Sequence, residues 1–264
     1  MEPAGDDGAA CLLGVERVQP AVALGLRDDP GREGCVGGAL GQPGVEAARI
    51  GLQREEAAHP HVLGISGGIA VDEHGRLGPD VVDRLGHGTA VAAAIREKAP
   101  GAPLLAVNVF DRALSTSGLA LAAAIRWAAA QEVALINLSL GTLNAEHEAA
   151  LADAIAEAAR HGAMLVAAAP QDGDRWLPGA LDGVIQVEAE WDRDRSTCDV
   201  TVRSGRMLVR ASPYPRPIPG VPPERNLKGV SFAVANATGL LALLLEVAGV
   251  RSVHELGRRL ELGE

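Results

Sequence analysis

The strongest constraint on the fold is a regular alternation of apolar runs and helical stretches that begins near His59. Four apolar runs have the length of strands and lie between turn signals: residues 104–110, 133–139, 164–169 and 184–189. The intervening pattern predicts helices over residues 89–97, 119–131 and 146–161. Strands that are apolar on both faces must be covered on both sides, so we expect an α/β fold with a mostly parallel sheet and helices on both faces.

Residues 1–58 differ from the rest of the chain. They are rich in Gly, Pro, Arg and Glu, and no period of two or 3.6 residues persists, although residues 18–26 resemble a strand. We therefore expect an atypical N-terminal segment over residues 1–58, either disordered or read out of frame. One domain follows over residues 59–264, in which residues 198–210 predict a hairpin that turns at Ser204 and Gly205.

The charge of the chain excludes some partners. The formal net charge is −10 and the pI is near 5.2, which argues against nucleic acid or an anionic membrane as the principal partner. The apolar stretch over residues 230–250 contains Ser231, Asn236, Thr238 and Glu246, and we interpret it as a buried central helix rather than a membrane span.

The N-terminal residues indicate where in the cell the protein is expected, and the cysteines indicate which kinds of site and cross-link are not expected. The first residues are acidic and lack a basic segment followed by an apolar run, so we expect no signal peptide and a cytoplasmic protein. The three cysteines, Cys11, Cys35 and Cys198, are scattered and form neither a zinc-binding spacing nor a disulfide framework.

Two short glycine-flanked motifs place reactive side chains at the starts of expected helices. His87 lies in Gly-His-Gly-Thr-Ala-Val (residues 86–91), and Ser231 lies in Gly-Val-Ser-Phe-Ala (residues 229–233). A neutral histidine within hydrogen-bond reach of a serine hydroxyl can take its proton during attack on a carbonyl, and a helix N-terminus favours developing negative charge. Each residue alone is also explained as an ordinary helix cap, since Ser is a favoured N-cap.

These motifs, in this order, resemble the histidine and serine motifs of the subtilisin-like serine peptidases (the subtilase family, peptidase S8). The resemblance covers about residues 59–245. It implies a three-layer subtilisin-like fold and a serine endopeptidase that hydrolyses peptide bonds through an acyl-enzyme. In that reaction Ser231 would be the nucleophile and His87 the general base, with a peptide or protein substrate and no cofactor or metal.

Two further segments resemble substrate-binding parts of that family. Residues 136–141 (Ile-Asn-Leu-Ser-Leu-Gly) resemble the strand whose backbone pairs with an extended substrate, which implies a binding role for Ser139, Leu140 and Gly141. Residues 165–173 resemble the strand and loop that supply the oxyanion-hole asparagine, and Gln171 stands in its place. The resemblance implies that Gln171 and the Ser231 N–H stabilise the oxyanion, whereas the alternative for Gln171 is a solvent-exposed loop residue.

The family's aspartate motif, Asp-(Ser/Thr)-Gly at the end of the first core strand, is missing. His59-Pro60 resembles the tail of that motif, but the corresponding slot near residues 51–53 reads Gly-Leu-Gln. The nearby acids are interpreted as solvated surface residues: Asp28, Asp29, Glu55, Glu56, Asp72 and Asp83. Either the acid is lost or an out-of-frame N-terminus hides it.

Two other readings of the chain stay open. Loss of the orienting acid alone costs roughly 10⁴-fold in rate, less than loss of the serine or histidine, so one alternative is a catalytically impaired homologue that binds peptides in extended conformation. The other is a metal site built from His59, His61, His74 and His87, although their spacing matches no ligand motif.

Overall fold

The structure is a computed structural model that describes residues 65–110, 115–171, 173–218, 220–222, 225–248 and 255–258. It also describes the backbone of two earlier strands, β1 (Ala21–Leu24) and β2 (Ala48–Gly51). The expected boundary at residue 58 and the His59-Pro60 pair lie outside the described residues, so the division of the chain stays a prediction.

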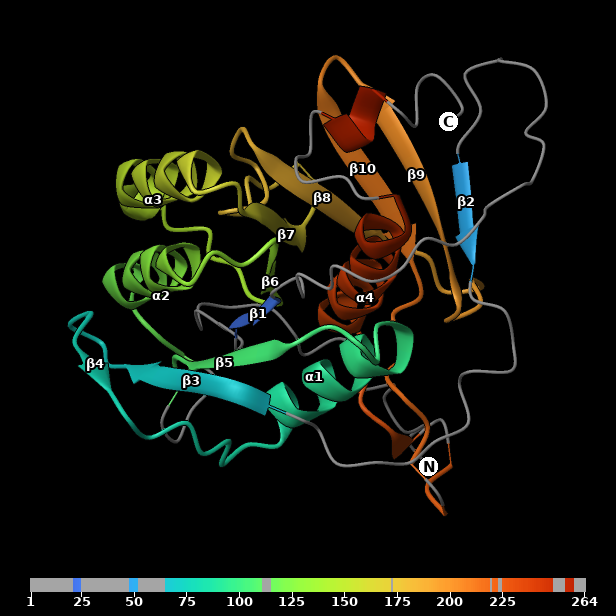
Figure 1. Ribbon diagram of the computed structural model, residues 1–264, viewed down its shortest axis with the longest axis horizontal. Coiled ribbons are helices and arrows are strands. Elements are labelled where there is room, and N and C mark those ends of the chain that lie inside the picture. Colours follow the sequence, from blue (N-terminus) through green and yellow to red (C-terminus); the bar gives the residue numbers. More distant parts are fainter. Residues whose placement is uncertain are drawn as a thin grey trace, which may run out of the picture.

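A single ten-stranded sheet runs through the molecule in the order β2-β9-β10-β8-β7-β6-β1-β5-β3-β4 (Figure 1). The later strands are β3 (Ile65–Val71), β4 (Leu77–Gly78), β5 (Leu104–Asn108), β6 (Leu135–Leu138), β7 (Met164–Ala168), β8 (Val184–Ala189), β9 (Thr197–Arg203) and β10 (Arg206–Ala211). Strands β10, β8, β7 and β6 pair in parallel, and so do β3 and β5. Among the described strands, four pairings are parallel and five are antiparallel, so the sheet is mixed and its parallel part is the run β10-β8-β7-β6 together with β3 and β5. All four predicted apolar strands are confirmed.

Strand β1 runs against this pattern. It lies between β5 and β6 and pairs with both in antiparallel register, so that its first residue, Ala21, faces Val107 and Leu138. Its last residue, Leu24, faces the first residues of those two strands. The strand expected within residues 18–26 is therefore present as β1. Its carboxyl end lies at the opposite edge of the sheet from the carboxyl ends of β5 and β6.

Helices α1 to α4 of the described part of the chain cover the two faces of the sheet, as expected. Helices α1 (His87–Lys98) and α4 (Val230–Ala248) pack on one face, and α2 (Gly118–Ala130) and α3 (Glu148–Arg160) on the other, with a short 3₁₀ turn, η1 (Ala145–His147), before α3. Strand β7 shows the two-sided burial: Met164 and Val166 belong to the α1–α4 core, whereas Leu165 and Ala167 belong to the α2–α3 core.

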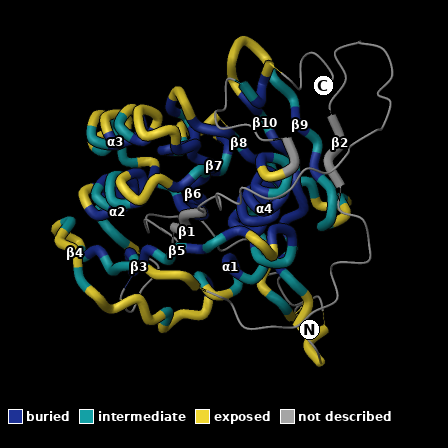
Figure 2. Tube along the Cα trace, in the orientation of Figure 1, coloured by how far each residue is buried: buried dark blue, intermediate teal, exposed yellow. Residues whose placement is uncertain are grey.

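The apolar stretch that contains Ser231 forms the buried central helix α4 (Figure 2). Among the helices that the structure describes, none combines the length and the apolar character needed to cross a membrane. The predicted hairpin is also confirmed, because β9 and β10 are joined by Ser204 and Gly205, both with positive φ.

Adjacent glycines in β3 provide a test of this packing. A β-carbon at Gly68 would overlap the carbonyl oxygen of Ala106 on β5, whereas one at Gly67 would meet only the Leu105 side chain at 3.5 Å, an ordinary contact. We expect Gly68→Ala to lower the free energy of unfolding by about 2 kcal/mol because the two strands must move apart. The matched control Gly67→Ala should change it by no more than about 0.5 kcal/mol. Urea unfolding of both variants checks this, and equal effects would contradict the β3–β5 register.

Candidate active site

His87 is the first residue of α1, and the chain turns sharply to reach it. Gly86 caps the helix with φ of 73°, in the left-handed region that favours glycine. The His87 side chain is 7% exposed, so the turn delivers the imidazole into a nearly closed environment.

Asp83 holds the start of this helix in place. Its Oδ1 accepts hydrogen bonds from the backbone N–H groups of Leu85 and Gly86, at 3.0 and 2.9 Å. Its Oδ2 accepts from the backbone N–H and the hydroxyl of Thr89, at 2.7 and 2.8 Å. The interpretation of Asp83 as a solvated surface acid is therefore corrected, because this half-buried carboxylate satisfies the Thr89 N–H in the first turn of α1 and two N–H groups of the turn before it.

Burial and the nearby carboxylate act in opposite directions on the imidazole. Burial lowers the pKa of His87 below its usual value, and the negative charge of Asp83 partly offsets this by raising it. Burial also tends to raise the pKa of Asp83, but the hydrogen bonds from Thr89, Leu85 and Gly86 hold it below its usual value. Around neutral pH His87 is therefore uncharged and able to accept a proton.

The Nδ1 atom of His87 is buried and has no hydrogen-bond partner. This is the nitrogen that the triad acid would engage, and no acidic side chain in the described part of the chain hydrogen-bonds to it. The ring is instead contacted by Phe232, whose centroid lies 5.4 Å away with the two planes tilted by 36°. Phe232 directly follows Ser231, so this contact brings the histidine and serine motifs together.

Ser231 lies in the first turn of α4 and is 7% exposed. The helix starts after Gly229, whose φ of 144° favours glycine and whose carbonyl accepts from the Phe232 N–H at 2.9 Å. The first turn of a helix carries the positive end of the helix dipole, which favours negative charge nearby. The sequence-predicted nucleophile and base thus start two helices that pack against each other.

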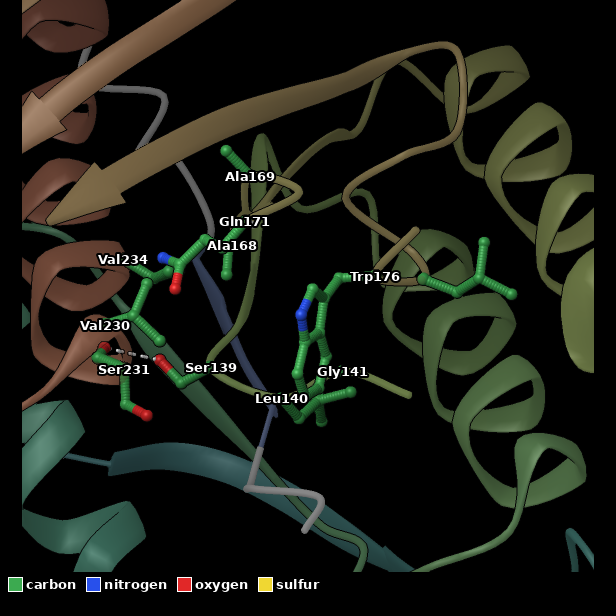
Figure 3. Close-up of a pocket in the computed structure, with 11 residues that line it drawn as sticks. Ser139, Leu140, Gly141, Ala168, Ala169, Gln171, Trp176, Val230, Ser231 and Val234 are labelled. Carbon is green, nitrogen blue, oxygen red and sulfur yellow. Dashed lines mark hydrogen bonds between the residues drawn. The ribbon is translucent and has the colours of Figure 1, made fainter. Parts of the chain in front are cut away.

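The predicted substrate-binding segment lies beside the start of α4. Ser139 directly follows the carboxyl end of β6, and its hydroxyl donates to the backbone carbonyl of Ser231 at 2.8 Å (Figure 3). Immediately after Gly141, the backbones of Thr142 and Leu177 exchange hydrogen bonds of 2.8 and 2.9 Å. Residues 139–141 are therefore anchored at both ends.

A pocket of about 190 Å³ opens between these segments. Its lining, as far as the structure describes it, carries no charged side chain and consists of Ser139, Leu140, Gly141, Ala168, Ala169, Gln171, Trp176, Leu177, Val230, Ser231 and Val234. Trp176 stands across the pocket from Val230 and Ser231 (Figure 3). A β-carbon at Gly141 would lie 3.1 Å from both the Trp176 ring and the Leu177 carbonyl oxygen, which explains the glycine.

Gln171 combines features of both sequence-based alternatives. The residue is exposed, as a loop glutamine would be, yet it lines the pocket together with Ser231. Its side-chain amide points toward the first turn of α4 (Figure 3). The structure therefore brings His87, Ser231, Gln171 and the segment 139–141 to one place, and the role of each remains a proposal.

Sequence reasoning missed three residues of this site. Asp83 had a readable signal, an acid placed within one turn of a helix start. Phe232 was named only as part of a motif, and nothing in the sequence indicated that its ring would meet His87. Trp176 reaches the pocket through the pairing of Leu177 with Thr142, which no local pattern reveals.

The metal alternative gains no support from the described residues. They contain no group of three His, Cys, Asp or Glu side chains that could hold a metal ion. His74 is exposed and pairs with Glu73, while His59 and His61 lie outside the described residues.

The sequence of this chain is similar to sequences of known proteins. Residues 70–194 match the model of the subtilase family. A thermostable alkaline protease of Halalkalibacterium halodurans is 35% identical over 207 residues, which cover 71% of this chain and 54% of that protein, so the chain spans about half the length of this relative.

Two solved structures share the fold. Sphericase superimposes with a TM-score of 0.57 and 22% identity, and a psychrophilic protease with a TM-score of 0.54 and 22% identity. Each comparison covers 75% of this chain and 83% of the other chain. Residues 70–194 therefore form a subtilase-like segment within an α/β domain of subtilisin-like fold.

Proposed function

We propose that this protein is a serine endopeptidase that hydrolyses peptide bonds through an acyl-enzyme. The observation that carries the proposal is the meeting of His87 and the Ser231–Phe232 pair at the starts of two packed helices, beside an uncharged pocket. The subtilase-like segment and the alkaline protease relative support the same reaction class.

In the proposed reaction, the Ser231 hydroxyl oxygen attacks the scissile carbonyl carbon while the imidazole of His87 accepts the hydroxyl proton. The resulting oxyanion is stabilised by the Ser231 backbone N–H and by the Gln171 side-chain amide. His87 then gives its proton to the leaving amine, and the acyl-enzyme forms. A water molecule, deprotonated by the same imidazole, attacks the ester, and the proton returns to the Ser231 oxygen as the acid product leaves.

One observation favours a second candidate, a slow homologue that mainly binds peptides in extended conformation. To accept the serine proton through Nε2, neutral His87 must carry its hydrogen on Nδ1. That atom is buried without a partner, and an unsatisfied buried donor costs about 1–3 kcal/mol. No acceptor therefore holds the hydrogen on Nδ1 or orients the ring, and the chain as given should react slowly.

The nucleophile is tested first by covalent labelling. Ser231→Ala should abolish labelling by a fluorophosphonate, and His87→Ala should slow it by at least about 10³-fold because the base is lost. Ser212→Ala is the matched control, since Ser212 is likewise a buried serine but does not line the pocket. Mass spectrometry of the intact protein measures the adduct, and labelling that persists in Ser231→Ala would refute the assignment.

The electrostatic role of Asp83 predicts a pH effect with a defined sign. Asn at position 83 keeps one accepting oxygen, which can serve either the Thr89 donors or the Leu85 and Gly86 N–H groups, and it carries no charge. Because the Asp83 charge raises the pKa of His87, Asp83→Asn should lower that pKa further and move the acid limb of the labelling rate to lower pH. NMR titration of the His87 ring checks the same shift, and an unchanged or raised pKa would contradict it.

The uncharged pocket predicts a preference in the residue that precedes the scissile bond. Peptides with an apolar side chain there should be cleaved at least about tenfold more efficiently than those with Lys or Glu, because a buried charge would find no partner. Trp176→Ala should raise kcat/KM for Phe relative to Ala by about tenfold. Trp191→Ala is the control, because Trp191 is 52% exposed, meets Tyr214 edge-on and does not line the pocket. A preference unchanged by Trp176→Ala would exclude Trp176 as the wall that sets pocket size.

A further inference from the structure

A chain of buried hydrogen bonds connects the middle of α4 to its own first turn through strand β6. The Thr238 hydroxyl lies 3.0 Å from Asn137 Oδ1 and 2.8 Å from the carbonyl oxygen of Val234. Asn137 Nδ2 donates to Ser139 Oγ at 3.0 Å. The Ser139 hydroxyl then donates to the carbonyl oxygen of Ser231 at 2.8 Å (Figure 3). We call Thr238, Asn137 and Ser139 the buried relay.

The relay is enclosed and its members are mutually dependent. Thr238 and Asn137 have no exposed surface, and Ser139 is 2% exposed. Asn137 faces Thr238 with its amide oxygen and Ser139 with its amide nitrogen, so the contact with Thr238 helps to orient the amide that bonds Ser139. The single hydrogen of the Thr238 hydroxyl is shared between Asn137 Oδ1 and the Val234 carbonyl. Polar groups in such a dry network strengthen one another, and removing one of them leaves its neighbour unsatisfied.

The position of the relay gives it a consequence for the candidate active site. Ser139 begins the predicted peptide-binding segment, and Ser231 is the proposed nucleophile, 92 positions later in the chain. Both residues line the uncharged pocket, whereas Thr238 and Asn137 do not. The rate of such a reaction depends steeply on the distance between the nucleophile and the bound peptide, because a displacement of about 1 Å can lower the rate by about 10²-fold.

We propose that Thr238 and Asn137 are positioning residues, which fix the bound peptide relative to the Ser231 oxygen by holding the Ser139 hydroxyl on the Ser231 carbonyl. The inference rests on the proposed function to the extent that Ser231 is the nucleophile. It adds two residues to that site which touch neither the pocket nor the reacting atoms.

The helix has other anchors, so the relay is not needed to keep α4 in the fold. Phe232, Leu240 and Leu241 are buried in the apolar core on the α1–α4 face of the sheet. Asn236 Nδ2 donates to the carbonyls of Ser212 and Tyr214, at 2.8 and 2.9 Å, on the loop after β10. Loss of one relay hydroxyl should therefore misplace the first turn of α4 without unfolding the protein.

Thr238→Val tests the relay, because valine keeps the shape of threonine and removes only the hydroxyl. We expect fluorophosphonate labelling of Ser231 to slow by about tenfold. The affinity for an acetylated tetrapeptide ending in leucine, measured by calorimetry, should stay within about twofold because the pocket is intact. Thr238→Ser should restore labelling to within about twofold of the wild-type rate, since it returns the hydroxyl.

Ser212→Ala is the matched control, because it also removes a fully buried hydroxyl close to α4 but outside the relay. It should leave the labelling rate unchanged. Wild-type labelling in Thr238→Val, failure of Thr238→Ser to restore the rate, or an equal loss in Ser212→Ala would overturn the proposal.

Amide hydrogen exchange separates failure of the relay from failure of the proposed function. Thr238→Val should speed exchange at residues 139–141 and 231–235 and leave α3 unchanged. If wild-type protein is not labelled at all, the proposed peptidase function is overturned, and exchange alone decides the relay. Unchanged exchange at both segments would then overturn the relay as well.

Discussion

Helices α1 and α4 approach so closely that a β-carbon at Gly239 would lie 2.9 Å from the carbonyl oxygen of Ile95 and 3.0 Å from the Lys98 side chain. This contact, made possible by a glycine in the middle of α4, fixes the two helices against each other over one face of the sheet. The two helices also begin close together, because His87 in the first turn of α1 contacts Phe232 in the first turn of α4. Ser231 directly precedes Phe232, so the helix packing brings Ser231 near His87. The candidate site is therefore a result of helix packing as much as of the two motifs.

Much of the scaffold could be predicted from the sequence because strands that are buried on both faces of the sheet consist of continuous apolar runs. Apolar runs such as residues 184–189, which are bounded by turn residues and too short for a typical helix, indicate strands in a covered sheet, and β8 matches that range. The predicted start of α1 was two residues late, because Gly88 weakened the helical pattern while the stabilising contact came from Asp83 outside the helix. The strands and helices of the sheet could thus be predicted because they depend mainly on the apolar pattern of their own residues, whereas the exact start of α1 depends on a residue outside the helix.

The site itself was only partly predictable, since its shape depends on contacts between distant segments. The motifs identified His87, Ser231 and the segment 139–141, and the structure brings them together. Trp176 and Thr238 gave no signal, because their importance comes from the pairing of Leu177 with Thr142 and from the bond between Thr238 and Asn137. Neither contact leaves a periodicity or a spacing that a single sequence displays.

The direction of β1 explains why no acid reaches His87 Nδ1 from this strand. Ser139 follows the carboxyl end of β6 and contacts Ser231, so the residues of the candidate site gather at the carboxyl edge of the parallel strands. An acid at the end of a parallel strand between β5 and β6 would arrive at that edge. Strand β1 occupies this slot in the opposite direction, and its carboxyl end at Leu24 lies beside Leu104 and Leu135, at the far edge. A complete triad therefore requires a different chain direction in this slot, not merely a substitution within residues 21–24. A recoded N-terminus that supplies a parallel strand ending in aspartate would satisfy Nδ1, favour the productive tautomer of His87, and raise its pKa toward the physiological range.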